Sequence, residues 1–199
     1  MTALLILFAL YGLFLYKANA SERTRIADDQ YAVWSDFLNE HFLDDWGNNS
    51  TCTVVIRERT TRHEGDKGTF RDALLASLPS AFRTTPTLGA APETMRSFSS
   101  RNGWRQIVTR RFLLNGRYVI APETDVDLFF TETVRFNSRY ADSCGGYIEL
   151  SAAGFNAYRT EALFRADHIC GLCGEGGYVL MRKSGQKWRI VVWQLTWVS

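Results

Sequence analysis

Apolar residues follow helical spacing near the start of the chain and strand spacing near its end. Between residues 26 and 45 large apolar side chains recur at helical intervals, which predicts an amphipathic helix. These side chains are Tyr31, Trp34, Phe37, Leu38 and Phe42. The next segment, residues 53–60, is apolar in its first half and charged in its second, which predicts a strand.

The middle of the chain contains further helical patterns and one hairpin signal. Residues 69–78 predict a short helix that Pro79 ends, residues 93–100 predict one or two helical turns, and residues 125–140 predict a longer helix. The dipeptide Asn115-Gly116 favours the tight turn of a β-hairpin, because both turn positions need a positive φ angle. The extended segments on either side of it are therefore predicted to pair with each other. Those segments are residues 105–114 and 117–120.

The last third of the chain predicts only strands and turns. The strands fall at residues 147–150, 160–168, 177–183 and 188–198. In the last strand, alternation places Trp188 and Val192 on one face and Trp193 and Trp197 on the other, which predicts a central or doubly covered strand. The whole order predicts an α+β fold: an antiparallel sheet with helices on one face and a C-terminal third made only of strands.

The N-terminus has the layout of a secretory signal peptide. Residues 3–16 are apolar, and Ala18-Asn19-Ala20 forms a small-x-small cleavage site, so cleavage is expected after Ala20. Residues 21–199 then form a single α+β domain in the periplasm or outside the cell. A retained N-terminal anchor is the alternative, since no Lys or Arg precedes the apolar run, and it is the one membrane contact that we expect.

The chain has four cysteines, and an even number in an exported protein predicts disulfides with three possible connectivities. The pairing closest in sequence joins Cys170 to Cys173 and leaves Cys52 for Cys144. In the chain-entropy model the long loop contributes roughly 4–5 kcal/mol to stability and the short loop about 2 kcal/mol.

Composition and charge narrow the class of protein further. The chain is 46% apolar and 22% charged with a net charge of +2, which is typical of an ordinary globular domain. Its arginines are interleaved with acidic residues instead of forming one stripe, and this argues against a nucleic-acid partner.

Residues 146–199 combine several short motifs. The motifs are Ser151-x-x-Gly154-Phe155-Asn156, Cys170-Gly-x-Cys173-Gly-x-Gly-x-Tyr178, and the closing Trp197-Val-Ser199. This pattern resembles a group of uncharacterised bacterial exported proteins that end in the same strand, glycine turn and hairpin. The resemblance implies kinship and brings no activity with it. Arg165 stands where an apolar residue is expected, which predicts that its strand lies at an edge of the sheet.

Cys170-Gly-Leu-Cys173 is the sharpest chemical motif, and we favour a structural disulfide for it. Thiol–disulfide catalysis needs a cysteine of lowered pKa, usually at a helix N-terminus, whereas glycines and a strand follow here. Zinc held by both thiolates and His168 is a further alternative, but a fourth ligand is not specified and the compartment favours disulfides. No metal or other cofactor is predicted.

Three other features suggest chemistry or binding. His168, beside Asp167 at a strand end, suits either a general base or, as we favour, a turn residue that donates to a backbone carbonyl. Glu58 lies between two arginines and could be catalytic. We favour the alternative that it belongs to a solvated strand face with ordinary ion pairs. The last strand's tryptophans could line a cleft for a flat ligand, although such rings mostly fill cores. They are Trp188, Trp193 and Trp197.

No known catalytic motif joins these residues. The sequence therefore favours a non-catalytic module that binds an unknown small ligand or an envelope protein. The alternative is an enzyme, thiol-redox or metal-assisted, centred on His168, Cys170 and Cys173.

Overall fold

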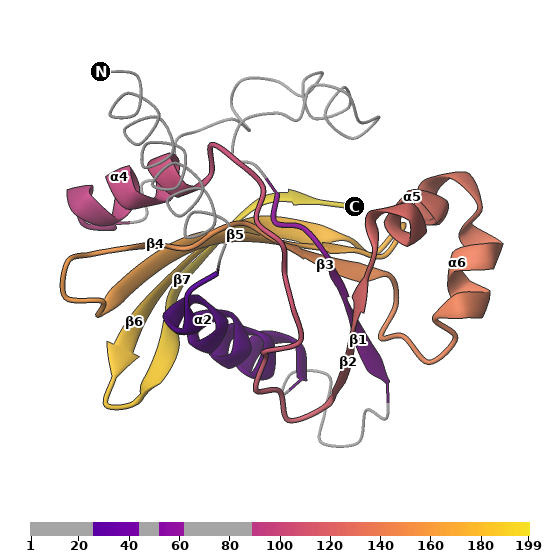
Figure 1. Ribbon diagram of the computed structural model, residues 1–199, viewed down its shortest axis with the longest axis horizontal. Helices are drawn as coiled ribbons and strands as arrows, with labels where there is room; N and C mark the ends of the chain where they lie inside the picture. Colours follow the sequence, from indigo (N-terminus) through magenta and orange to yellow (C-terminus); the bar gives the residue numbers. More distant parts are fainter. Residues whose placement is uncertain (1–25, 44–51, 62–88) are drawn as a thin grey trace, which may run out of the picture.

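The computed structural model describes residues 26–43, 52–61 and 89–199, which share one mixed β-sheet (Figure 1). The strands are β1 (Thr53–Arg57), β2 (Arg117–Ala121), β3 (Tyr147–Leu150), β4 (Gly154–Phe155), β5 (Glu161–Ile169), β6 (Glu175–Ser184) and β7 (Lys187–Val198). Their order is β2-β1-β3-β5-β6-β7, with β4 paired to β5. β1 runs parallel to β2 and β3, and the other pairs are antiparallel. The α+β fold and the all-strand C-terminal third are confirmed, while the sheet is mixed and not purely antiparallel.

Helices lie on both faces of the sheet, whereas the sequence predicted helices on one face only. They are α2 (Asp28–Leu38), which continues as a π-helix η1 (Asn39–Leu43), α4 (Pro92–Arg101), α5 (Glu123–Thr131) and α6 (Thr133–Arg139). Figure 1 shows α2 below the sheet and α4 above it, with α5 and α6 at the end near β1 and β2. We call the two sides of the sheet the α2 face and the α4 face.

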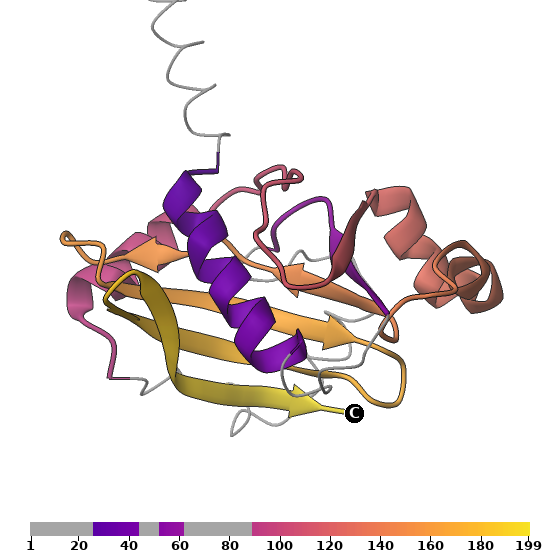
Figure 2. The ribbon, with the colours of Figure 1, turned by 90° about the horizontal axis from the view of Figure 1, so that it is seen from below.

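The α2 face holds the largest part of the core. Figure 2 shows α2 crossing the strands, and its buried Trp34, Phe37 and Leu38 pack there. Their partners in the sheet include Ile56, Ile148, Phe164, Val179 and Met181. Each fully buried apolar side chain of this size stabilises the fold by about 1.5–3 kcal/mol, so the helical pattern at the start of the chain is explained by this contact.

On the opposite face, α4 lies unusually close to β4. Gly154 makes this possible, because a Cβ atom there would overlap the backbone of Phe98. Phe98 packs on Leu163 and Leu180, which point away from α2. The N-terminus of α4 has no capping side chain of its own; instead Glu161 of β5 accepts hydrogen bonds from Ala91 N–H (2.7 Å) and the Thr94 hydroxyl (2.9 Å).

The predicted hairpin around Asn115-Gly116 is wrong. β2 pairs in parallel with β1, and the preceding segment bonds to side chains of the first helical region instead. Tyr31 Oη accepts from Thr109 N–H (2.8 Å), and Ser35 Oγ accepts from Leu113 N–H (2.9 Å). These contacts satisfy the backbone that a hairpin partner would have satisfied.

Two β-bulges change the faces of β7. Leu180 pairs with Val192 and Met181 with Ile190, so Val191 is an extra residue, and Thr196 is extra in the same way. Trp188 and Trp193 consequently share the α2 face, while Trp197 lies on the α4 face. β7 is an edge strand with contacts on both faces, but Trp188 is its only buried residue, so the strand is neither central nor fully covered.

Other predictions have mixed outcomes. β5 lies inside the sheet, so the prediction that Arg165 marks an edge is wrong; Arg165 forms a two-point ion pair with Asp167 instead. The helix predicted at residues 125–140 breaks at Glu132 into α5 and α6. The helix predicted at residues 69–78 and the N-terminal leader lie outside the described residues.

Candidate functional site

Both cysteine pairs are disulfides with the predicted connectivity. Cys52–Cys144 has its Cα atoms 5.0 Å apart and joins the start of β1 to the turn before β3. Cys170–Cys173 has its Cα atoms 5.4 Å apart and closes the turn between β5 and β6. Disulfides of this kind are typical of an oxidising, non-cytoplasmic compartment.

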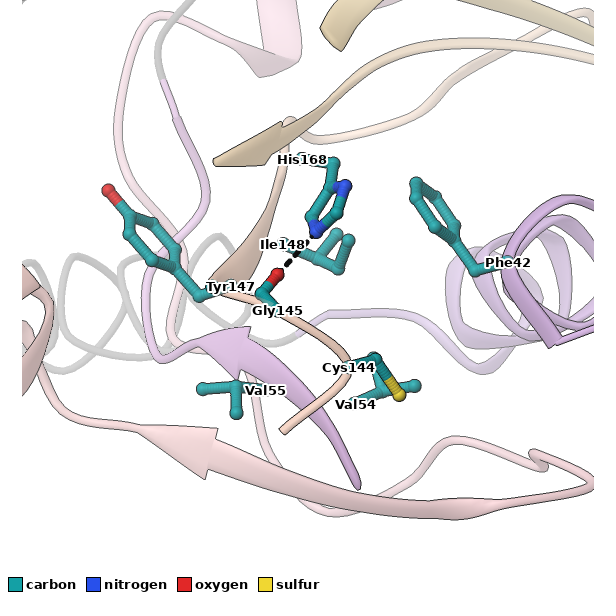
Figure 3. Close-up of a pocket in the computed structure, with 9 residues that line it drawn as sticks. Phe42, Val54, Val55, Cys144, Gly145, Tyr147, Ile148 and His168 are labelled. Atoms are coloured by element: carbon teal, nitrogen blue, oxygen red, sulfur yellow. Dashed lines mark hydrogen bonds between the residues drawn. The ribbon is translucent and has the colours of Figure 1, made fainter. Parts of the chain in front are cut away.

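His168 lies between these two turns, near the end of β5, and is only 6% exposed. Its Nε2 atom is 2.6 Å from the Gly145 carbonyl oxygen, as Figure 3 shows. Because a carbonyl only accepts, Nε2 carries the proton and donates it to this bond. Burial lowers the pKa of His168, although the bond to Gly145 and the charge of Glu175 act in the opposite direction, so the ring is neutral at pH 7.

The pocket beside His168 is small and mostly apolar. Its volume is about 10 Å³, which leaves room for no more than one water molecule. Phe42, Val54 and Ile148 form its apolar walls, and the Tyr147 hydroxyl points away from the imidazole (Figure 3). In its described form the pocket accommodates no substrate.

The residues that the sequence grouped around His168 are not brought together with it. Asp167 is next to His168 in a strand and so points to the opposite face, where Trp197 Nε1 donates to its carboxylate at 2.6 Å. Ile56, Ile148 and His168 are paired neighbours across β1, β3 and β5. Glu58 follows Ile56 by two residues and does not line the pocket. Cys170 and Cys173 are bonded to each other.

The three tryptophans of β7 do not line one cleft. Trp188 is buried against Phe155, with ring centroids 5.9 Å apart. Trp193 stacks against both Phe37 (5.0 Å between ring centroids) and His41 (4.3 Å), which lie only 5.6 Å from each other. Trp197 lies on the other face of the sheet, so the three rings cannot bind one flat ligand together.

Sequence reasoning missed a network of charges on the α4 face. Arg57 donates to Glu149 (2.7 Å) and to Glu123 (2.8 Å), and Arg105 donates to Glu123 (3.0 Å). Burial tends to raise the pKa of Glu123, but the hydrogen bonds and charge of Arg57 outweigh it and lower that pKa. The network ties β1 to β3 and to the start of α5. The alternating charges at residues 57–59 were its signal, but the partners lie far away in sequence.

A second set of contacts holds the end of the chain against the short disulfide loop. We call it the C-terminal clasp, formed by Gly171, Gly174, Trp197 and Ser199. Ser199 Oγ donates to Gly171 O (3.0 Å) and accepts from Gly174 N–H (2.9 Å), while Ser199 N–H donates to Gly174 O (2.8 Å). A Cβ atom on Gly174 would lie 2.8 Å from the Trp197 ring, so the glycine provides the space for that ring.

The loop also carries the most exposed large apolar side chain of the described residues. Leu172 at its apex is 95% exposed, and Val198, next to Ser199, is 69% exposed. Both side chains are attached to backbone that the clasp fixes. Among the described ranges, His, Cys, Asp and Glu side chains form no group of three that could hold a metal ion. The described helices are all too short or too polar to cross a membrane.

The residues that carry the C-terminal sequence pattern thus have structural roles in the turns and close contacts of the sheet. No protein-family model, curated protein or solved structure matches this chain.

Proposed function

We propose that this chain is an exported, non-catalytic module that binds another protein in the periplasm or outside the cell. The observation that carries the proposal is the small volume of the His168 pocket, about 10 Å³. A small ligand usually needs a cavity of several hundred Å³, so the His168 pocket does not suit one, and we assign binding to the surface of the described residues. The disulfides and the leader pattern at residues 1–20 support export.

Leu172 and Val198, two exposed apolar side chains on backbone held by the clasp, are candidate anchors for such a contact. Interfaces depend on a few apolar or aromatic anchors, and anchors held in one conformation lose less entropy on binding. The disulfide and Ser199 hold Leu172 in this way. The enzyme alternative centred on His168 receives less support, because its Nε2 proton is already bonded to Gly145 beside a pocket of only about 10 Å³.

Site-specific photo-crosslinking tests the proposal. A photoreactive phenylalanine analogue replaces Leu172 in one variant and Leu113 in another, since Leu113 is 79% exposed but lies in the segment beside α2. In the organism that makes the protein, the variant at position 172 should give a crosslinked product of defined mass after export. Equal products from both positions, or none from position 172, would contradict the proposal.

A further inference from the structure

We propose that the Cys170–Cys173 disulfide is an exchange site for dithiol reductants, and that its reduction loosens the end of the chain by breaking the contact of Ser199 with Gly171 in the C-terminal clasp. This inference does not depend on the proposed function. It concerns a bond that the structure exposes and a set of contacts that the bond supports.

The two disulfides differ in their access to a reagent. Cys173 is exposed and follows the exposed residues Gly171 and Leu172. Cys52 and Cys144 are both partly buried, and Cys144 packs against the core on the α2 face. Exchange requires a thiolate to approach a sulfur atom, so the exposed bond is the one that reacts in the folded protein.

The contacts of Ser199 couple this bond to the end of the chain. Its hydroxyl bridges Gly171 O, just after Cys170, and Gly174 N–H, just after Cys173. The bridge requires these two backbone groups to stay a fixed distance apart, which the closed loop ensures. Once the loop opens, the backbone at Gly171 gains freedom and Ser199 loses one of its two anchors.

The chemistry is a two-step exchange. One thiolate of the reductant attacks Sγ of Cys173, the bond between the sulfurs breaks, and Cys170 leaves as a thiolate that takes a proton. The second thiol of the reductant then attacks the mixed disulfide and releases Cys173. Two electrons and two protons reach the cysteine pair, and the reductant becomes a disulfide.

The pair acts in this reaction as the target and not as a catalyst. Cys170 follows β5 and Cys173 precedes β6, so neither cysteine lies at the N-terminus of a helix. A helix N-terminus would lower the pKa of an attacking thiol, and no helix begins in this loop. We expect a reducing partner to open the Cys170–Cys173 disulfide and an oxidising compartment to form it again.

The experiment uses the full folded protein with both disulfides formed. The protein is treated with increasing dithiothreitol, thiols are trapped with N-ethylmaleimide, and the labelled cysteines are mapped by mass spectrometry. Amide hydrogen exchange of the peptide that ends at Ser199 is measured on the same samples. We expect Cys170 and Cys173 to be labelled at least about tenfold faster than Cys52 and Cys144, with exchange at Ser199 rising by a similar factor.

Two results would overturn the proposal. In one, all four cysteines become labelled together, as the protein unfolds. In the other, the short disulfide opens selectively but exchange at Ser199 does not change. The double variant Cys170→Ala with Cys173→Ala gives an independent measurement, since it should show the faster Ser199 exchange without any reductant.

Discussion

The two disulfide regions of this domain differ in the length of chain that they close and in what surrounds them. Cys52 and Cys144 are 92 residues apart and join β1 to the turn before β3. These strands are parallel. Ile56 pairs with Ile148, and isolated bridges at Thr53–Ser143 and Thr61–Ser151 lie on either side of that pair. Cys170 and Cys173 are 3 residues apart, between β5 and β6, which stay paired from Glu161–Arg182 to His168–Glu175.

The difference shows that the same bond serves two purposes in one sheet. Parallel strands need a long crossover, whose closure costs entropy, so the long disulfide stabilises a contact between segments that lie far apart in sequence. An extensive antiparallel pairing already holds β5 to β6, so the short disulfide adds little to the sheet. It shapes the loop that presents Leu172.

Removing each disulfide by paired Cys→Ala substitutions is expected to have the largest effect. Loss of Cys52–Cys144 should lower the free energy of unfolding by roughly 4–5 kcal/mol, whereas loss of Cys170–Cys173 should lower it by about 2 kcal/mol or less. Urea denaturation followed by circular dichroism measures both values. Equal losses, or a greater loss from the short loop, would show that the comparison is wrong.

The second region should depend on its glycines as well as on its disulfide. A Cβ atom on Gly176 would overlap the Asp167 carboxylate and Trp197 Nε1, which bond to each other. Gly176→Ala should therefore cost about 1–3 kcal/mol, measured by the same denaturation. Gly103→Ala is the control, because its Cβ would meet only Ser100 O, at 3.8 Å. Similar losses of unfolding free energy in both variants would show that Gly176 has no special role.

Ser199→Ala tests the clasp alone. It removes the hydroxyl that bridges Gly171 and Gly174, and we expect a loss of about 1 kcal/mol in the free energy of unfolding. Ser138→Ala removes an exposed hydroxyl that bonds within α6, and its effect should be close to zero. If the two variants cannot be distinguished, Ser199 does not stabilise the loop.

A smaller, pH-dependent effect should come from the bond between His168 and Gly145, which links the two regions. Burial lowers the pKa of His168 in the folded state, so the unfolded chain binds a proton first as pH falls below about 6.5. The free energy of unfolding should therefore decrease as pH falls from 7 towards 5. In His168→Gln, which can still donate to Gly145, this part of the decrease should be missing. An unchanged pH profile would mean that His168 contributes nothing to it.

Local patterns in the sequence predicted the parts of this fold that local contacts determine. The helical spacing of Trp34 and Phe37, the strands β3, β5, β6 and β7, and the nearest-neighbour pairing of the cysteines all follow from short stretches of chain.

Contacts between distant residues could not be predicted in this way. β2 pairs with β1 instead of forming the expected hairpin, because Tyr31 and Ser35 bind the segment before it. The bulges of β7 depend on its register with β6, so alternation alone assigned Trp193 and Trp197 to the same face. The resemblance to uncharacterised exported proteins stays a prediction.

The most direct test of the account is the intact mass of the protein purified from the organism that makes it, alkylated under denaturing conditions without reductant. Export and oxidation predict a chain that begins at Ser21 and carries no alkyl group, because all four cysteines are in disulfides. A chain that begins at Met1 with every cysteine alkylated would contradict the central claim that this domain works, oxidised, outside the cytoplasm.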